Sequence, residues 1–212
     1  MRLELRSGIS YRGAPAALSP ASIGIVLLAS GFASAPAFAH SEQGAAIDFW
    51  GGFRHPIFGL DHVIAMVAVG LWGAFLGPPA IWLLPVVFPL VMAIAGAAGV
   101  LGLPLHGVET GIALSAIMLG AMVAGAVKPP LWIAALLVGA FAIFHGYAHG
   151  VELPVGADAI AFSMGFVIAT GMLHLCGIAF GGLSHWRAGR IAVRLAGVII
   201  AVIGVGYLMG FA

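Results

Sequence analysis

Long apolar runs, separated by short breaks rich in proline, glycine and charge, dominate the chain from about residue 57 to its end. A helix that crosses roughly 30 Å of hydrocarbon needs about 20 residues, and in lipid its backbone must satisfy its own hydrogen bonds. The pattern therefore predicts an all-α, polytopic membrane protein, a compact bundle of six transmembrane helices with antiparallel neighbours along the chain. The predicted spans are about residues 57–77, 80–101, 107–127, 130–149, 158–182 and 190–211.

The start of the chain has the pattern of a secretory signal peptide. Three arginines within the first 12 residues precede an apolar core at 23–32 and a small-x-small site that ends at Ala39. We predict cleavage after Ala39, which divides the chain into a signal peptide (1–39) and a transmembrane domain (40–212). An uncleaved anchor helix is the alternative. Cleavage would leave His40 with a free α-amine, and that pair is a candidate outer metal ligand.

The basic residues predict how the helices are oriented. Lysine and arginine are retained on the cytoplasmic side of a membrane. With the mature N-terminus outside, the inner loops hold Lys128, Arg187, Arg190 and Arg194, whereas the outer segments hold only Arg54. The pattern therefore favours a multi-pass protein of the bacterial inner membrane, with both termini of the mature chain in the periplasm.

The composition limits the ligands and partners that the chain can have. The chain is 62% hydrophobic and 7% charged, with a formal net charge of +1, so it lacks the basic surface that nucleic-acid binding requires. Its one cysteine, Cys176, excludes an internal disulfide and a thiolate cluster. Eight histidines and seven acids leave imidazole and carboxylate as metal ligands, which suit divalent transition metals. The expected partners are such an ion, the lipid bilayer and, as an open alternative, a second copy of the chain.

The first His-rich cluster lies at the predicted outer entry of the first span. Pro56 suits a first helical position, so we expect the helix to begin there, with His55 just outside it. At about 100° per residue His55 and His62 share a face, and Asp61 points about 120° away. A break at Gly59 would bring all three together. Alternatively, Asp61 accepts a hydrogen bond from a ligand imidazole, or Asp61 and His62 form a purely structural pair.

The second cluster lies at the predicted outer end of the fourth span. His145, His149 and Glu152 follow one another at i, i+4 and i+7, which places two imidazoles and a carboxylate within about 60° on one helix face. This spacing predicts metal binding. Zinc peptidases have a glutamate directly after the first histidine of a similar motif. Gly146 occupies that position here, so hydrolysis by that route is unsupported.

Further histidines and acids extend the pattern. His106 and Glu109 open the third predicted span on the same outer face; the alternative is that both are ordinary helix-end residues, Glu109 being favoured by the helix dipole. His174 lies well inside the fifth span, where it is either a step on an ion path or a hydrogen-bonded core residue. His185 lies in the basic inner loop and is expected to be solvated.

At these residues the chain resembles the HupE/UreJ family of nickel and cobalt permeases. The resemblance rests on the HPxxGxDH element at 55–62 and the FHGxAHGxE element at 144–152, and it extends over essentially the whole chain. It implies entry of Ni²⁺ from the periplasm for hydrogenase or urease maturation. The functional positions that it implies are His55, Asp61, His62, His145, His149 and Glu152, with Glu109 and Phe88 as further matches.

The resulting hypothesis is a secondary permease that imports Ni²⁺, or Co²⁺, and that is neither an enzyme nor the holder of a tightly bound cofactor. In this hypothesis the region of His40 and His106 captures the ion, and His174 hands it inward. The residues that dehydrate and hold it in between are His55, Asp61, His62, His149 and Glu152. An intramembrane zinc-dependent hydrolase with the same ligands, and Glu109 or Asp61 as base, is the main alternative. A third is an electron carrier with b-type haem, in which His62, His145 or His174 would supply the axial ligands.

Overall fold

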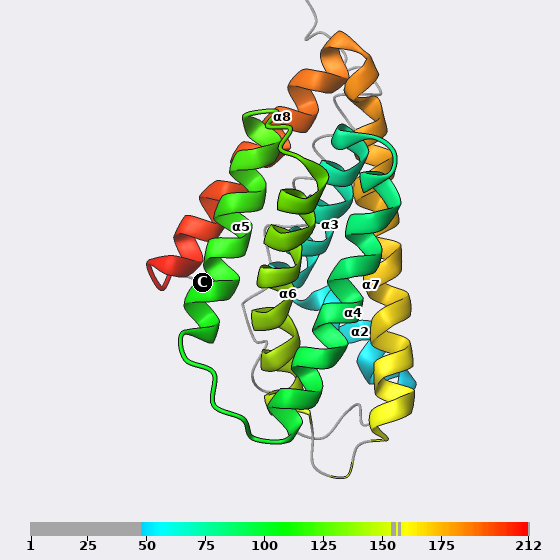
Figure 1. Cartoon of the computed structure of the whole chain (residues 1–212), viewed down its shortest axis with the longest axis vertical. Helices are drawn as coiled ribbons and strands as arrows, with labels where there is room; N and C mark the ends of the chain where they lie inside the picture. The colour runs from blue at the N-terminus through cyan, green and yellow to red at the C-terminus, as the bar shows by residue number, and fades with distance from the viewer. Residues whose placement is uncertain (1–47, 154–155, 157, 212) are drawn as a thin grey trace, which may run out of the picture. The chain divides into compact units, whose positions relative to one another are not determined.

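The computed structural model describes residues 48–153, 156 and 158–211. The predicted signal peptide and His40 lie outside these residues. In the described part every regular element is a helix, which confirms the all-α prediction. In chain order (Figure 1) the elements are α2 (Phe49–Phe58), α3 (Leu60–Leu76), α4 (Ala80–Val100), α5 (Val108–Ala124), α6 (Leu131–Glu152), α7 (Ala159–Gly181), the short 3₁₀ helix η1 (Gly182–His185) and α8 (Arg187–Leu208).

The longest helices have the dimensions of membrane spans. Four segments are long and apolar enough to cross a bilayer: α4, α6, α7 together with η1, and α8. Helices α2 and α3 pass the same test together and count as a fifth, although they meet at an angle of 79°. Helix α5 is apolar but has only 17 residues. The structure thus contains four or five candidate spans, and the number six stays a prediction.

The helix pairs with the largest contacts are not always neighbours in sequence. They are α4 with α6, α5 with α8, and α3 with α7. Between them lies a core that includes the fully buried side chains of Trp72, Leu84 and Phe88. The Trp72 indole Nε1 donates a hydrogen bond of 3.1 Å to the carbonyl of Val127, which ties α3 to the loop after α5. Many large apolar side chains remain exposed, as lipid-facing helices require.

The start of the first helix differs from the prediction. We expected the helix to begin at Pro56, but α2 begins at Phe49 and contains Pro56 near its end. The cause is a better N-cap upstream: Asp48 Oδ1 accepts hydrogen bonds from the backbone N–H groups of Trp50 at 3.0 Å and Gly51 at 3.1 Å. The prediction that Pro56 starts the helix was therefore wrong.

Glycines allow the helix backbones to approach one another closely. At many of the helical glycines a methyl group would overlap a neighbouring helix, as small-xxx-small spacing predicts. Four pairs that have this spacing in the sequence predict close helix contacts, and three of them make such contacts. Gly146 and Gly150 face α4, Gly177 and Gly181 face α3, and Gly120, which is paired with Ala124, faces α8. The fourth predicted pair, Gly206 and Gly210, was wrong, because nothing lies within 4 Å of the place where their side chains would begin.

This contrast predicts opposite effects of the same substitution. In Gly120→Ala the new methyl carbon would lie 2.5 Å from Ala201 N and 2.6 Å from Gly197 O, so α5 and α8 must separate. Gly206→Ala meets no atom and gains helix propensity of about 0.5–1 kcal/mol. We expect Gly120→Ala to lower the midpoint of thermal unfolding in detergent and Gly206→Ala to leave or raise it. Equal shifts would show that the α5–α8 contact does not depend on glycine.

Candidate metal centre

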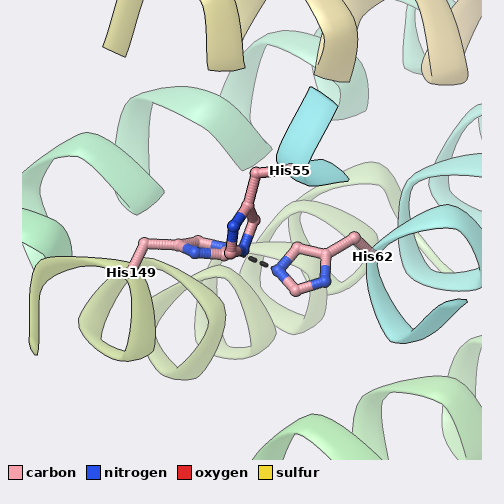
Figure 2. A group of neighbouring side chains, drawn as sticks. All are labelled: His55, His62 and His149. Atoms are coloured by element: carbon pink, nitrogen blue, oxygen red, sulfur yellow. Dashed lines mark hydrogen bonds between the residues drawn. The ribbon is translucent and has the colours of Figure 1, made fainter. Parts of the chain in front are cut away.

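Three imidazoles from three helices converge at one point. His55 comes from α2, His62 from α3 and His149 from α6, and their rings point toward one another (Figure 2). Each offers one nitrogen, and these nitrogens all lie within 4.8 Å of one another. The closest pair is His62 Nε2 and His149 Nε2, 2.6 Å apart. We call these three residues the three-His cluster.

The cluster forms because the chain turns sharply at Gly59. Helix α2 ends there, with the Gly59 N–H bonded to the carbonyl of His55 at 3.0 Å, and α3 leaves at 79°. The turn brings His55 beside His62, with ring centroids 5.2 Å apart. It also needs a residue without a side chain, since a Cβ at Gly59 would lie 2.6 Å from His62 Nδ1. The helix break at Gly59, which the sequence offered as one alternative, is therefore present.

Asp61 orients the second histidine. Its Oδ1 lies 2.7 Å from His62 Nδ1, so the carboxylate accepts the proton of that nitrogen. The Nε2 lone pair of His62 is then free to point into the cluster, as is usual for a metal-binding imidazole backed by a carboxylate. Both residues are shielded from solvent, the His62 side chain being 8% exposed and that of Asp61 22%. Asp61 thus faces the outer nitrogen of His62, away from the convergence point.

An aromatic wall from α7 closes one side of the cluster. The Phe166 ring lies 4.5 Å from the His149 ring, 6.1 Å from that of His55 and 6.4 Å from that of His62, centroid to centroid. One turn earlier, Phe162 lies 6.2 Å from His55. The sequence reasoning missed both residues, because nothing in it showed that α7 packs beside α2. Their i, i+4 spacing was the available signal.

His145 lies one helical turn from His149 but outside the three-His cluster. Its ring centroid is 6.0 Å from that of His62, and it is fully buried. Its Nδ1 donates a hydrogen bond of 3.1 Å to the carbonyl of Phe141, which leaves the lone pair on Nε2. The i, i+4 spacing therefore brings two imidazoles to the same face without bringing them to the same point.

The remaining predicted site residues are more scattered. Glu152 is the last residue of α6, Glu109 lies in the first turn of α5, and His106 precedes α5; all three are exposed. Phe88 on α4 and His174 on α7 are buried in the bundle. Within the described residues, the three-His cluster is the one set of three His, Cys, Asp or Glu side chains close enough to share an ion. The roles of the other predicted residues stay predictions.

Comparison with known proteins agrees with this arrangement. The HupE/UreJ protein family model matches residues 27–207. The chain belongs to the HupE/UreJ family. It is 44% identical to Protein HupE of Rhizobium leguminosarum bv. viciae over 176 aligned residues. These residues make up 82% of this chain and 92% of that protein. No solved structure matches the chain. The HupE/UreJ family is related to nickel and cobalt transport, and the two elements that carry the resemblance supply all three imidazoles.

The donor set in this HupE/UreJ chain suits a borderline divalent ion. Imidazole nitrogens bind Ni²⁺, Co²⁺ and Zn²⁺, whereas Cu(I) prefers thiolate or thioether sulfur. Two nitrogens that share one ion at bond lengths of about 2.1 Å lie roughly 3 Å apart. The 2.6 Å between His62 Nε2 and His149 Nε2 is slightly shorter, so binding requires the two rings to part by a small rotation.

The turn predicts that Gly59→Ala weakens metal binding. The new methyl carbon would lie 2.6 Å from His62 Nδ1 and 3.1 Å from Asp61 Oδ1, so it must disturb the hydrogen bond that orients His62. Loss of such a partner typically costs about 10- to 100-fold in metal affinity. Equilibrium dialysis with ⁶³Ni²⁺ on the purified HupE/UreJ protein measures the change. Gly171→Ala, which meets nothing within 4 Å, is the matched control. Unchanged affinity in Gly59→Ala would contradict this account of the turn.

Proposed function

We propose that the chain is a secondary permease of the bacterial inner membrane that imports Ni²⁺, and also Co²⁺, from the periplasm to the cytoplasm. The observation that carries the proposal is the three-His cluster, three converging imidazoles enclosed by apolar side chains in a chain that belongs to a transport-related family. The cargo would serve the maturation of a nickel enzyme such as a hydrogenase or urease, in line with the family resemblance. The protein needs no resident cofactor for this task.

Three protein ligands suit a carrier better than a storage site. Structural metal sites use four protein ligands and close around the ion, whereas an open site keeps positions for exchangeable water. A transported ion must bind well enough to lose part of its hydration and weakly enough to leave. His55, His62 and His149 replace some of the water and leave the rest in place.

Exposed groups near the cluster act as the collecting surface. The loop before α5 and the C-terminal end of α6 lie at the same end of the bundle (Figure 1). That end carries Glu152, Glu109 and His106, all exposed. Carboxylates gathered at the mouth of a site raise the local concentration of cations and their rate of association. We assign capture to this surface, together with His40 at the proposed mature N-terminus.

The membrane topology that goes with this function has six spans. Helices α2 and α3 make one bent span, α5 is the short one, and α4, α6, α7 with η1, and α8 are the others. At the end opposite the collecting surface, Lys128 lies in the connection between α5 and α6 and Arg187 is the first residue of α8. Arg194 of α8 donates a hydrogen bond of 2.7 Å to the carbonyl of Ala124 there. Lysine and arginine are retained in the cytoplasm, and this rule supports an orientation with the three-His cluster toward the periplasm. A dication that enters gains roughly 4.6 kcal/mol per 100 mV of membrane potential.

Uptake measurements test the transport proposal. Liposomes that contain the purified protein and an internal chelator are expected to accumulate ⁶³Ni²⁺, and His149→Ala is expected to lower the initial rate by at least roughly tenfold because one of three ligands is lost. His185→Ala, which removes an exposed histidine at the other end of the bundle, should transport at the native rate. Competition by Co²⁺ and Zn²⁺ ranks the cargo.

Two different results of these measurements would contradict the permease or favour the hydrolase. Absence of uptake by the native protein would refute the permease. If one equivalent of zinc also stayed bound through purification, the intramembrane hydrolase would become the better reading, because a structural or catalytic ion is retained and a cargo is released.

Cysteine labelling tests the orientation. In a Cys176→Ala background, Leu103→Cys places a thiol on the exposed loop before α5, and Ala188→Cys places one beside Arg187. A membrane-impermeant maleimide applied to intact spheroplasts is expected to label Leu103→Cys fully and Ala188→Cys only after permeabilisation. The reverse pattern would show that the three-His cluster faces the cytoplasm and that the import direction is wrong.

A further inference from the structure

A second set of polar side chains lies deeper in the bundle than the three-His cluster. The described residues contain three buried side-chain polar atoms without a hydrogen-bond partner: His145 Nε2, Thr170 Oγ1 and His174 Nε2. The three residues are at most 2% exposed. An unpaired buried polar group costs about 1–3 kcal/mol, and folded proteins pair the great majority of such groups. All three occur in one part of an apolar bundle, so their presence needs a physical reason.

The three atoms continue a line that starts at the cluster. On α7, Phe166, Thr170 and His174 follow at i, i+4 and i+8 and share one face. Phe166 packs against all three imidazoles of the cluster. With a rise of about 1.5 Å per residue, Thr170 lies roughly 6 Å and His174 roughly 12 Å farther along the helix. The line therefore runs from the cluster into the bundle.

Phe88 of α4 lies between the two deep histidines. Its ring centroid is 5.6 Å from that of His145 and 5.7 Å from that of His174, and its side chain is completely buried. Together with the 6.0 Å between His62 and His145, these contacts make a continuous series of rings from α3 through α6 and α4 to α7. An aromatic face in such a series attracts a passing cation through its quadrupole.

The deep histidines are held in place by the backbone. A Cβ at Gly70 would overlap the carbonyl of His174, and one at Gly177 would overlap the carbonyl of Val67, so α3 and α7 touch at this depth. His145 is fixed by its hydrogen bond to the carbonyl of Phe141, which directs its Nε2 lone pair away from its own helix backbone. These contacts fix the His174 backbone and the His145 imidazole, and they leave the Nε2 atoms of both residues without a hydrogen-bond partner.

We propose that His145, Thr170 and His174 form an inner transit site for Ni²⁺, distinct from the three-His cluster and divided by the Phe88 ring. The proposal rests on the permease function proposed above. The ion exchanges His62 and His149 Nε2 for His145 Nε2, passes Phe88 and Thr170 Oγ1, and then binds His174 Nε2. On leaving the cluster the ion gives up three imidazoles for one, and water takes the vacated positions; only ligands are exchanged, so no proton or electron is transferred.

The spacing of the donors favours passage over storage. Of the described residues, only the three-His cluster brings three His, Cys, Asp or Glu ligands within reach of one ion. Beyond it, His145 and His174 each contact the Phe88 ring and belong to no such group of three. Single imidazoles bind a dication weakly and release it quickly, and conduction requires binding of that kind. In a storage site the three polar groups would meet at one ion. As donors for an ion in transit they are spread along its route, which explains why all three are unpaired.

The test separates binding at the cluster from movement through the bundle. His174→Leu removes the deep donor at similar volume, and Met172→Leu, on the exposed side of the same helix, is the matched control. Equilibrium dialysis with ⁶³Ni²⁺ and the visible absorption of bound Co²⁺ report on the three-His cluster, and uptake into chelator-loaded liposomes reports on transport. We expect His174→Leu to bind as the native protein does and to lose at least roughly tenfold in uptake rate. Thr170→Val should lose less.

Other results of this test would contradict either the inner transit site or the permease function. Native uptake by His174→Leu would overturn the inner transit site and leave the permease standing, whereas no uptake by the native protein would refute the permease itself. Loss of both binding and uptake in a monodisperse His174→Leu protein would show that His174 supports the cluster and is not a separate site. If His174→Leu does not fold, His174→Gln replaces it, with native binding and an uptake rate below the native rate expected; native uptake by His174→Gln would overturn the inner transit site.

Discussion

The sharp turn at Gly59 is the constraint on which the candidate site depends. An uninterrupted helix would carry His55 and His62 on one face about 10 Å apart along its axis, too far for a shared ion. The 79° change of direction replaces that separation with rings 5.2 Å apart. The same residue leaves room for the Asp61–His62 hydrogen bond, so one missing side chain controls both the position of an imidazole and the nitrogen that it presents.

Close helix packing then supplies the remaining partner. His149 reaches the turn because α6 lies against α4 through Gly146 and Gly150, and α7 closes the other side because Gly177 meets α3. Lipid provides little drive for apolar helices to associate, so these close backbone contacts contribute much of what holds the bundle together. Glycine thus acts twice in this protein: at one position it bends the chain, and at the others it brings helices near enough for polar side chains from three of them to meet.

Much of this could be predicted from the sequence, because spans and histidine spacing are local properties. The helical class, the approximate helix bounds and the two histidine-bearing elements follow from apolar periodicity and residue types. The contacts between distant helices do not, since short loops determine direction and not which faces meet. Phe166 was missed for that reason, and His145, which shares a helix face with His149, proved to lie beyond the cluster. The start at Pro56 failed because Asp48 is a stronger helix cap.

The buried Trp72, held by its hydrogen bond to the loop after α5, bears on whether protons can leak through the bundle. With Leu71 and Leu84 it fills the end of the bundle near the loop after α5 with completely buried side chains. A bacterial membrane stores work as a voltage, and any continuous file of water through a protein would let protons discharge it. Because Trp72 is completely buried, it would block such a file in a permease of the proposed kind, and an ion at the three-His cluster would then not be accompanied by a leak of protons.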